Sequence, residues 1–478
     1  MFDARFRRVA LALGAALLYP GKALAQSPPP PPPPTEAAPG TAAQDVASLR
    51  DEVKALRADL DEVRAAQSAG PSPAAATPRP LGYESFWPWV VPPEGLSLKG
   101  YLQSQYETHQ DSQDQLTQAG TTLNQDRFSI RRARVSLTGE WQYAALALEL
   151  DANTTSGPQV DLRKAEASLQ YRPDRKRPPI LMATLGLFDV PFGYELVESP
   201  RTRLFMERSV ASRAFFPAEP DLGLRLSGAL GFFRWTIAGQ NGEPLGESSP
   251  FVLQDPNAAK DVVFRFGIDT QPLRVLQVAA DVSSLRGRGF HAGTAATSAT
   301  IQWKDLNEDG VIQPYELIPV PGADATPSSN FDRWAVGGDL RASVQSLLGV
   351  TKVYGEFTIA QNLDRGLYIA DPVVTGVDQR ELGYYIGIVQ DVTPWGVVGL
   401  RYDHYDPNFD AVDKRQGKLL PFSEGISTWS PLAALVLPDR ARLVVQYDVI
   451  RNAFARTATG VPTSLPDNVF TVRLQVEL

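Results

Sequence analysis

The chain of 478 residues contains no cysteine and only three histidines, His109, His291 and His404. Without cysteine, neither disulfide bonds nor thiolate metal sites can hold the fold together. The histidines lie far apart in the sequence and no G-x-S-x-G motif occurs, which argues against an enzyme. A net charge of −8, from 46 basic and 54 acidic residues, argues against nucleic acid as a partner.

Long apolar runs are also missing. No stretch reaches the roughly 18 uninterrupted apolar residues that a membrane-spanning helix needs. A shorter apolar run, residues 9–18, follows three arginines and precedes the small residues at 23–25. This order is typical of a secretory signal peptide. We therefore expect residues 1–25 to be a signal peptide that is removed on export.

Residues 26–95 contain a periodic segment between two segments of low complexity. Seven consecutive prolines at 28–34 predict an extended spacer over residues 26–43. Residues 70–95, rich in proline and glycine, predict a second linker. Between them, residues 44–69 predict a coiled-coil helix, because apolar residues alternate at spacings of three and four at Val46, Leu49, Val53, Leu56, Leu60 and Val63. A lone amphipathic helix is the alternative, but one this short needs partners in water.

From Leu96 to the end of the chain, apolar and polar residues alternate, as in β-strands with two different faces. The last nine residues, FTVRLQVEL, alternate without a break. A soluble sandwich with one buried face would alternate too. Here, however, the segments are long, their polar faces carry full charges, and the pattern reaches the final residue, as in outer-membrane barrels. We therefore predict an all-β transmembrane barrel over residues 96–478.

Several motifs resemble the phosphate-selective porin O and P family: PFGYE at 191–195, FMERS at 205–209, DLG at 221–223, RRAR at 131–134 and DVTPWGVVGLRYD at 391–403. The resemblance implies a homotrimeric porin of about 16 antiparallel strands, surrounded by the lipid of the bacterial outer membrane. Some members have a periplasmic coiled coil, so the heptads would form a trimer stalk. About 24 residues are available for each strand and its connection, which suits transmembrane strands of about 9–11 residues.

The resemblance also implies that residues 193–220 fold inward and narrow the channel. This segment contains four arginines and four glutamates. Arginine suits oxyanions because its planar group donates paired hydrogen bonds. The alternative is that these arginines form salt bridges that only brace the segment, since acids are almost as numerous on the expected pore wall. The predicted anion-lining residues are Arg132, Arg134, Arg201, Arg203, Arg208, Arg213, Arg225, Arg234 and Arg265.

Residues 305–316, DLNEDGVIQPYE, match the twelve-position pattern of a calcium-binding loop. A polar turn that matches by accident is the alternative. Two prolines, Pro314 and Pro319, discourage a long following helix. We therefore expect a structural Ca²⁺ site in a surface loop between two strands. Its sharp turn falls at Gly310, and its predicted oxygen ligands are Asp305, Asn307, Asp309, Val311, Gln313 and Glu316.

These features predict an outer-membrane porin for the passive diffusion of small anions, such as phosphate or similar oxyanions. Two alternatives stay open. The chain could be a general porin of mixed selectivity, or an outer-membrane anchor whose coiled coil tethers peptidoglycan or a periplasmic partner. An anchor has no need of an inward segment at 193–220, so that segment favours a channel.

Overall fold

The computed structural model describes residues 95–478 except 115–121, 156, 175–176, 219, 244–254, 308, 416–417, 422–424, 438–439, 454–463 and 465–466. The predicted signal peptide, proline-rich spacer and coiled coil lie outside the described residues, as does the linker up to residue 94. The first strand begins at Gly95, one residue before the predicted start of the barrel.

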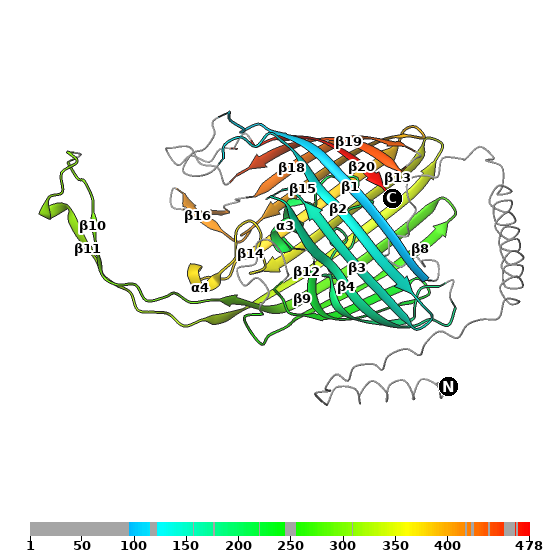
Figure 1. The fold of residues 1–478 in the computed structure, drawn as a ribbon, viewed down its shortest axis with the longest axis horizontal. Coiled ribbons are helices and arrows are strands. Elements are labelled where there is room, and N and C mark those ends of the chain that lie inside the picture. Colours follow the sequence, from blue (N-terminus) through cyan, green and yellow to red (C-terminus); the bar gives the residue numbers. More distant parts are fainter. Residues whose placement is uncertain are drawn as a thin grey trace, which may run out of the picture. The chain divides into compact units, whose positions relative to one another are not determined.

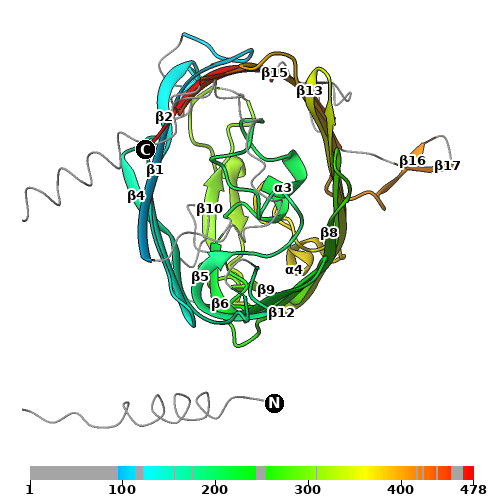
Figure 2. The same cartoon turned by 90° about the vertical axis from the view of Figure 1, so that its right-hand side faces the viewer.

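Sixteen strands of the described chain form one closed antiparallel barrel (Figures 1 and 2), which confirms the predicted barrel. Each barrel strand pairs with the next one along the chain, and β1 pairs with β20 to close the sheet. The barrel strands are β1 (Gly95–His109), β2 (Arg127–Glu140), β3 (Ala144–Asn153), β4 (Gln159–Tyr171), β5 (Leu181–Asp189), β6 (Pro220–Leu230), β7 (Phe233–Gln240), β8 (Asp261–Leu273), β9 (Leu276–His291), β12 (Ser329–Ser346), β13 (Gly349–Gln361), β14 (Arg380–Asp391), β15 (Gly396–Asp406), β18 (Ile426–Leu437), β19 (Ala441–Asn452) and β20 (Val469–Glu477).

Seven short elements of the described chain lie outside this sheet. Two pairs of them form separate two-stranded hairpins, and the other three are single helical turns or short helices. They are β10 (Thr300–Trp303) with β11 (Leu317–Val320), β16 (Val412–Arg415) with β17 (Lys418–Pro421), α3 (Val210–Phe215), α4 (Pro372–Thr375) and the 3₁₀ turn η1 (Pro314–Glu316). Of these elements, α3 lies within the predicted inward segment at 193–220, and η1 lies at the end of the predicted calcium loop at 305–316.

The two faces of the strands explain why the sheet closes in a membrane. In β20, Thr471, Arg473 and Gln475 point into the lumen and are at most 5 % exposed. Leu474 and Val476 point outward and are 48 % and 45 % exposed. So many apolar side chains on one outer surface are stable only against hydrocarbon. Among the described residues, no helix has the length and apolar character needed to cross a bilayer.

The two rims of the barrel differ in the length of their connections. Turns of two residues join β6 to β7 (231–232) and β8 to β9 (274–275). Gly231 has a φ of +62°, which glycine adopts without steric cost. Longer connections, such as 190–219 and 292–328, leave from the opposite rim. In outer-membrane barrels the short turns face the periplasm and the long loops face outward, and we call the two ends the short-turn rim and the long-loop rim.

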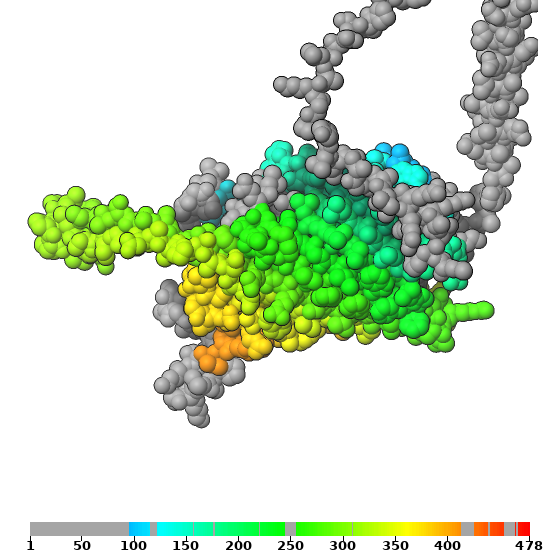
Figure 3. Space-filling model, turned by 90° about the horizontal axis from the view of Figure 1, so that it is seen from below, coloured from blue at the N-terminus to red at the C-terminus, as the bar shows by residue number. Residues whose placement is uncertain are grey.

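The hairpin of β10 and β11 projects far beyond the long-loop rim (Figures 1 and 3). All eight residues of its two strands are exposed. The 305–316 loop joins the two strands and ends in the 3₁₀ turn η1. The predicted calcium loop therefore lies between two strands at the outer end of a projecting hairpin.

The connection between β5 and β6, residues 190–219, folds into the lumen, and we call it the inward segment. Its helix α3 lies inside the barrel (Figure 2). Phe192, Val210, Phe215 and Phe216 are buried against lumen-facing wall residues that are apolar instead of polar, namely Ala238, Val263, Leu285, Ala335, Ala360, Tyr405 and Ile426. Each large side chain buried in this way contributes about 1.5–3 kcal/mol. The segment is therefore fixed against the wall between β7 and β18.

A second, smaller apolar contact holds the part of the inward segment that precedes α3. Phe205 and Met206 are 1 % and 4 % exposed. They pack against a patch formed by Val389, Val397, Leu432, Ala434 and Val444. The inward segment is thus anchored on both sides of its polar residues 207–209.

Candidate functional site: an arginine cluster beside the inward segment

Polar side chains of the inward segment brace its own backbone. The Glu195 carboxylate accepts hydrogen bonds from the backbone N–H and the hydroxyl of Ser209, both at 2.7 Å. Arg208 donates to the carbonyl of Phe216 at 2.8 Å and so satisfies a carbonyl at the end of α3. Arg401 of β15 donates to Glu195 at 3.1 Å, which ties the segment to the wall. The backbone around residue 207 is therefore held in place.

A β-bulge in β2 brings two consecutive arginines to the lumen. Opposite β1, the register passes from Arg132, which faces Gln103, directly to Ile130, which faces Ser104. Arg131 is therefore the extra residue of the bulge. In a regular strand, neighbouring side chains point to opposite faces, and Arg131 would face lipid. The bulge allows Arg131 and Arg132 to reach the same carboxylate inside the barrel.

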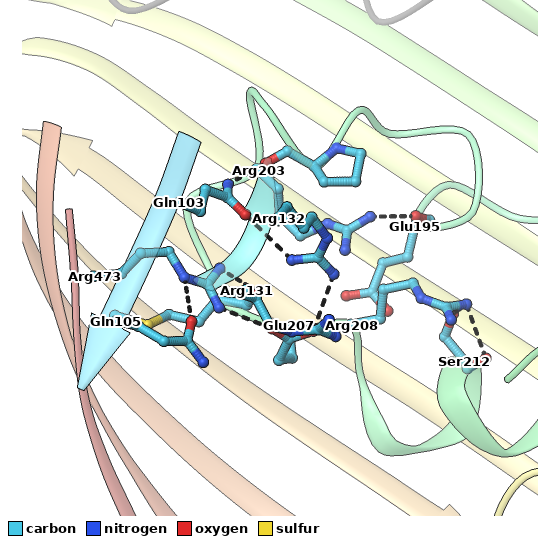
Figure 4. A network of polar contacts seen from close by, with 12 residues as sticks. Gln103, Gln105, Arg131, Arg132, Glu195, Arg203, Glu207, Arg208, Ser212 and Arg473 are labelled. Atoms are coloured by element: carbon cyan, nitrogen blue, oxygen red, sulfur yellow. Dashed lines mark hydrogen bonds and ion pairs between the residues drawn. The ribbon is translucent and has the colours of Figure 1, made fainter. Parts of the chain in front are cut away.

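That carboxylate belongs to Glu207 of the inward segment, which accepts hydrogen bonds from three arginines (Figure 4). Arg131 donates through Nε at 2.9 Å and through Nη2 at 3.0 Å. Arg132 donates at 3.3 Å, and Arg473 of β20 donates at 2.8 Å. We call these four residues the arginine cluster. Three arginines and one glutamate give it a net charge of +2, and the Glu207 side chain is 28 % exposed.

Neutral acceptors orient the arginines of the cluster. Gln103 of β1 accepts from Arg132 at 3.3 Å, and Gln105 accepts from Arg473 Nε at 2.7 Å. Arg473 also donates to the backbone carbonyl of Met206 at 2.7 Å. Because amides and carbonyls carry no net charge, they hold the guanidinium groups in place without cancelling the positive excess.

Glu207 stays ionised in this environment. Burial by itself raises the pKa of its carboxyl, but the charges of Arg131, Arg132 and Arg473 outweigh burial and hold the pKa well below its usual range. Arginine is also charged at neutral pH. The net charge of the cluster is therefore constant from about pH 5 to about pH 7.

A second bulge repeats this arrangement in β4. Opposite β3, the register passes from Lys164 to Leu162, so Arg163 is the extra residue. Two consecutive bases thereby reach Asp189, the last residue of β5. Lys164 Nζ lies 2.6 Å from the Asp189 carboxylate and Arg163 lies 3.9 Å from it. Each bulge therefore brings two consecutive bases to one acid. The acid is Glu207, within the inward segment, for the bulge in β2, and Asp189, just before that segment, for the bulge in β4.

The wall formed by β8, β9 and β12 carries an ion cluster that is closed to the lumen. Arg265 of β8 lies 3.1 Å from Asp281 of β9 and 3.3 Å from Asp339 of β12. Arg341 contacts both aspartates as well. The ring of Tyr194, from the inward segment, covers the Arg341 guanidinium at 4.9 Å. The four charged residues are at most 5 % exposed, so permeating ions meet little of their charge.

The predicted anion-lining arginines occupy several different environments. Among those on the strands, Arg132 belongs to the arginine cluster. Arg134 forms a salt bridge at 2.9 Å with Asp151 of the neighbouring strand β3, and Arg225 forms one at 2.7 Å with Glu166 of β4, two strands away. Arg265 lies in the closed ion cluster. Arg234 donates to the backbone carbonyls of Gly231, in the turn, and of Phe233, at the start of β7, where the distance is 3.1 Å.

Three of the four predicted arginines of the inward segment contact the segment itself or the nearby wall. Arg201 and Arg203 each form a salt bridge at 3.2 Å. Arg208 donates to backbone carbonyls within the segment. Arg213 is exposed in the last turn of α3. For Arg203 and Arg208, which are 5 % and 6 % exposed, the bracing interpretation describes their contacts best.

Two members of the arginine cluster, Arg131 and Arg473, are not among the predicted anion-lining residues. Strict alternation assigns Arg131 to the lipid face. Alternation does direct Arg473 into the lumen, but its contact with Glu207 depends on the pairing of β20 with β1, which no single strand reveals. A signal for the bulges was nevertheless present, because the consecutive bases at 131–132 and 163–164 would place a charge in lipid unless the strand is irregular.

Most of the predicted calcium ligands lie close together in the 305–316 loop. Gly310 has a φ of +70°, and its N–H donates to Asp305 Oδ2 at 2.9 Å. The amides of Asn307 and Gln313 donate to Asp309 Oδ2 at 2.9 and 2.6 Å. Asp309 therefore lies near the centre of the loop, where two neutral side chains contact it.

Glu316, the predicted bidentate ligand, is buried and turned toward protein donors. It accepts from the Trp303 indole at 3.0 Å and from the Leu306 N–H at 3.1 Å. Val311 donates its N–H to Asp309 at 2.7 Å. Within the described part of the chain, no three acidic or histidine side chains are grouped as a metal site would need. Calcium at this loop remains a prediction.

Residues 103–237 match the model of the family Phosphate-selective porin O and P. No curated protein matches the chain. Among solved structures, it is similar to OprB of Pseudomonas putida, with 12 % identity, a TM-score of 0.49 and coverage of 80 % of this chain and 94 % of that one. It is also similar to an anion-selective porin from Comamonas acidovorans, with 12 % identity, a TM-score of 0.48 and coverage of 80 % of this chain and 98 % of that one. The trimer form of OmpT from Vibrio cholerae is similar as well, with 8 % identity, a TM-score of 0.46 and coverage of 81 % of this chain and 100 % of that one.

The family match runs from β1 into β7 and includes the whole inward segment. It therefore covers the motifs that carry the resemblance at 131–134, 191–195 and 205–209. The matched family consists of porins and not of enzymes. With its closed barrel and apolar outer face, the chain is an outer-membrane β-barrel, and its residues 103–237 match the phosphate-selective porin O and P family.

Proposed function

We propose that this porin forms a water-filled channel for the passive diffusion of small anions, with phosphate and similar oxyanions as the preferred class. The arginine cluster is the observation that carries the proposal. It has a net charge of +2 and lies beside the segment that fills part of the lumen. Its lumen access is through the side chains of Arg131 and Glu207, which are 29 % and 28 % exposed, whereas those of Arg132 and Arg473 are 6 % exposed. A ring or cluster of one sign favours ions of the opposite sign.

The distribution of charge over the two walls supports anion preference. Among the residues named below, on the wall from β20 through β1 to β6 and at Glu207, seven bases contact five acids. Outside the arginine cluster four bases meet four acids, so these salt bridges do not cancel the net charge of +2 of the cluster. On the wall from β8 to β15, Asp281, Asp339 and Asp403 are at most 5 % exposed. The seven bases are Arg131, Arg132, Arg134, Arg163, Lys164, Arg225 and Arg473, and the five acids are Glu149, Asp151, Glu166, Asp189 and Glu207.

The chemistry of the cluster supports oxyanions within this class. Four N–H donors of three guanidinium groups already hold the carboxylate of Glu207 at distances of 2.8 to 3.3 Å. Phosphate presents the same kind of acceptor oxygens, and paired N–H donors match them well. A halide ion offers one spherical acceptor and gains less from such an arrangement.

The proposal predicts the sign of the reversal potential of the wild-type channel. In a planar bilayer with a tenfold gradient of potassium chloride, the potential is expected to show preference for chloride over potassium. Millimolar inorganic phosphate is expected to reduce the chloride current. A preference for potassium would contradict the proposal. Absence of any conductance from correctly folded protein would favour the anchor interpretation.

We also propose that the chain assembles as a homotrimer in outer-membrane lipid, with residues 44–69 as a three-stranded stalk. The heptad pattern and the family resemblance support this assembly, and the stalk lies outside the described residues. Light scattering of the detergent-solubilised full chain measures the mass of the assembly. Co-sedimentation with purified peptidoglycan tests whether the stalk also binds the cell wall.

A further part of the proposal is that the 305–316 loop binds Ca²⁺ as a structural ion. Asp305 Oδ1 is buried and has no hydrogen-bond partner among the described residues, which supports an additional ligand there. Asp305, Asn307, Asp309, the Val311 carbonyl, Gln313 and Glu316 would supply oxygen ligands, which are those Ca²⁺ prefers. A bound cation would reduce carboxylate repulsion and so order the loop. Before Glu316 can bind the ion, its carboxylate must give up the hydrogen bonds that it now accepts from the Trp303 indole and the Leu306 N–H.

Calcium is expected to protect this loop from protease. Extracellular loops of this type bind Ca²⁺ at roughly 10⁻⁴–10⁻³ M, so millimolar Ca²⁺ should slow cleavage in wild-type protein. Asp305→Ala with Glu316→Ala should abolish the effect, because it removes two charged ligands. Val311→Ala is the control, since it retains the carbonyl ligand and should behave as wild type. Equal cleavage of wild-type protein with calcium and with chelator would contradict this proposal.

A further inference from the structure

Glu207 is held in the way that an anionic ligand would be held. Elsewhere on this wall, arginines pair with acids of the wall itself, as Arg134 does with Asp151 at 2.9 Å. The carboxylate of Glu207 instead enters from the inward segment and meets Arg131, Arg132 and Arg473, which come from β2 and β20. Its 28 % exposure leaves it in reach of water in the lumen.

We propose, on the basis of the proposed anion channel, that the three arginines form an oxyanion-binding site whose resting occupant is the Glu207 carboxylate. A permeating oxyanion must share or displace this tethered competitor. A tethered group competes at a high effective concentration, in the millimolar range for short flexible tethers. Glu207 therefore weakens binding of the permeating ion. Conduction benefits, because an ion that binds too tightly to a channel does not leave it.

The surrounding contacts keep the site formed when the carboxylate moves away. Arg132 retains its hydrogen bond to Gln103, and Arg473 retains those to Gln105 and to the Met206 carbonyl. The guanidinium groups of Arg132 and Arg473 thus stay oriented toward the space that the carboxylate leaves.

The backbone beneath Glu207 is held independently of its side chain. Arg401 donates to the Glu207 carbonyl at 2.9 Å. Met206 accepts through its carbonyl, and its N–H donates to Gln446 at 3.0 Å. Displacement therefore requires rotation of one side chain and not movement of the inward segment.

Glu207→Gln tests the inference through the concentration of inorganic phosphate that halves the chloride current. Removal of the competing charge is expected to lower this concentration about tenfold, because the three arginines then lack a charged occupant. Glu198→Gln is the matched control. Glu198 is also a carboxylate of the inward segment, but it contacts Arg203 and the Tyr194 hydroxyl instead of the cluster. In Glu198→Gln, the phosphate concentration that halves the chloride current, called the half-blocking concentration, is expected to stay within about twofold of wild type.

A double variant separates occupancy of the site from net charge. Arg131→Gln with Glu207→Gln has the same net charge as wild type but lacks the competing carboxylate. Its half-blocking concentration is expected to lie below that of wild type. A value equal to that of wild type, or an unchanged value in Glu207→Gln, would overturn the inference.

The ion preference of the wild-type channel and the phosphate block of Glu207→Gln are separate measurements, so the two proposals can fail independently. If wild-type protein prefers cations, the proposed function fails, whereas the phosphate block of Glu207→Gln still reports on the oxyanion site. Assembly of each variant is checked by its heat-dependent migration on gels. If Glu207→Gln does not fold, Glu207→Ala provides the same comparison without a new amide.

Discussion

Replacing Arg131, Arg132 and Arg473 together by glutamine is expected to change the channel from anion preference to cation preference. The substitutions change the net charge of the arginine cluster from +2 to −1, because Glu207 remains. A unit charge about 4 Å from an ion is worth about 1 kcal/mol in water. Loss of three such charges should reduce the ratio of anion to cation permeability at least about tenfold. The reversal potential in a salt gradient measures this ratio.

A matched variant separates the position of the charges from their number. Arg127, Arg177 and Arg288 are exposed arginines outside the arginine cluster, near the ends of the barrel. Their joint replacement by glutamine removes the same total charge from the chain. It is expected to change the reversal potential only slightly, because salt screens exposed charges beyond about 10 Å. Equal effects of the two triple variants would show that the cluster does not determine selectivity.

Removal of the apolar anchor of the inward segment is expected to open the channel. Phe192 and Phe216 are 1 % exposed, and their rings lie 5.4 Å apart. Replacement of a buried phenylalanine by alanine costs about 3–5 kcal/mol. In the double variant this loss weakens the attachment of the segment, whereas the hydrogen-bonded strands of the barrel are unaffected. Single-channel conductance should therefore increase, and its fluctuations should become larger.

The control for this variant is Phe128→Ala. Phe128 is 84 % exposed at the start of β2, so its replacement removes a phenylalanine side chain without leaving a cavity. Its conductance should equal that of wild type. If the Phe192 and Phe216 double variant assembles as a barrel and conducts like wild type, the apolar contact does not hold the inward segment in place.

The arginine cluster shows how a local irregularity can place charge in a barrel. A bulge in β2 turns Arg131 inward, and a bulge in β4 does the same for Arg163. At each bulge, the strand therefore presents two consecutive bases to the lumen, where a regular strand would present one. The two acids that these pairs meet, Glu207 and Asp189, lie in or beside the inward segment. The bulges thereby connect the pore wall to the inward segment.

The strand pattern was readable from the sequence because alternate side chains of a strand point to opposite faces whatever the strand pairs with. The last strand is an example, with Arg473 and Gln475 inside and Leu474 and Val476 outside. The inward position of residues 193–220 came from the family resemblance and not from this pattern. The structure has residues 190–219 in the lumen, with α3 near their end.

The partners of the charges were not readable, because they depend on contacts between segments far apart in the chain. Arg473 reaches Glu207 only because β20 pairs with β1 and the inward segment folds back toward that seam. The apolar patch under α3 also departs from the expected polar wall, since Val263 and Leu285 face the lumen where the helix covers them.

The sequence by itself determined the two faces of the barrel, since the period of a strand is a local property of its backbone. Only the tertiary structure decided which charges remain open to the lumen. Bulges, the closure of the sheet and the packing of the inward segment are properties of paired strands. They gather three arginines around Glu207, where the side chains of Arg131 and Glu207 are 29 % and 28 % exposed, and they cover charges of both signs on the opposite wall.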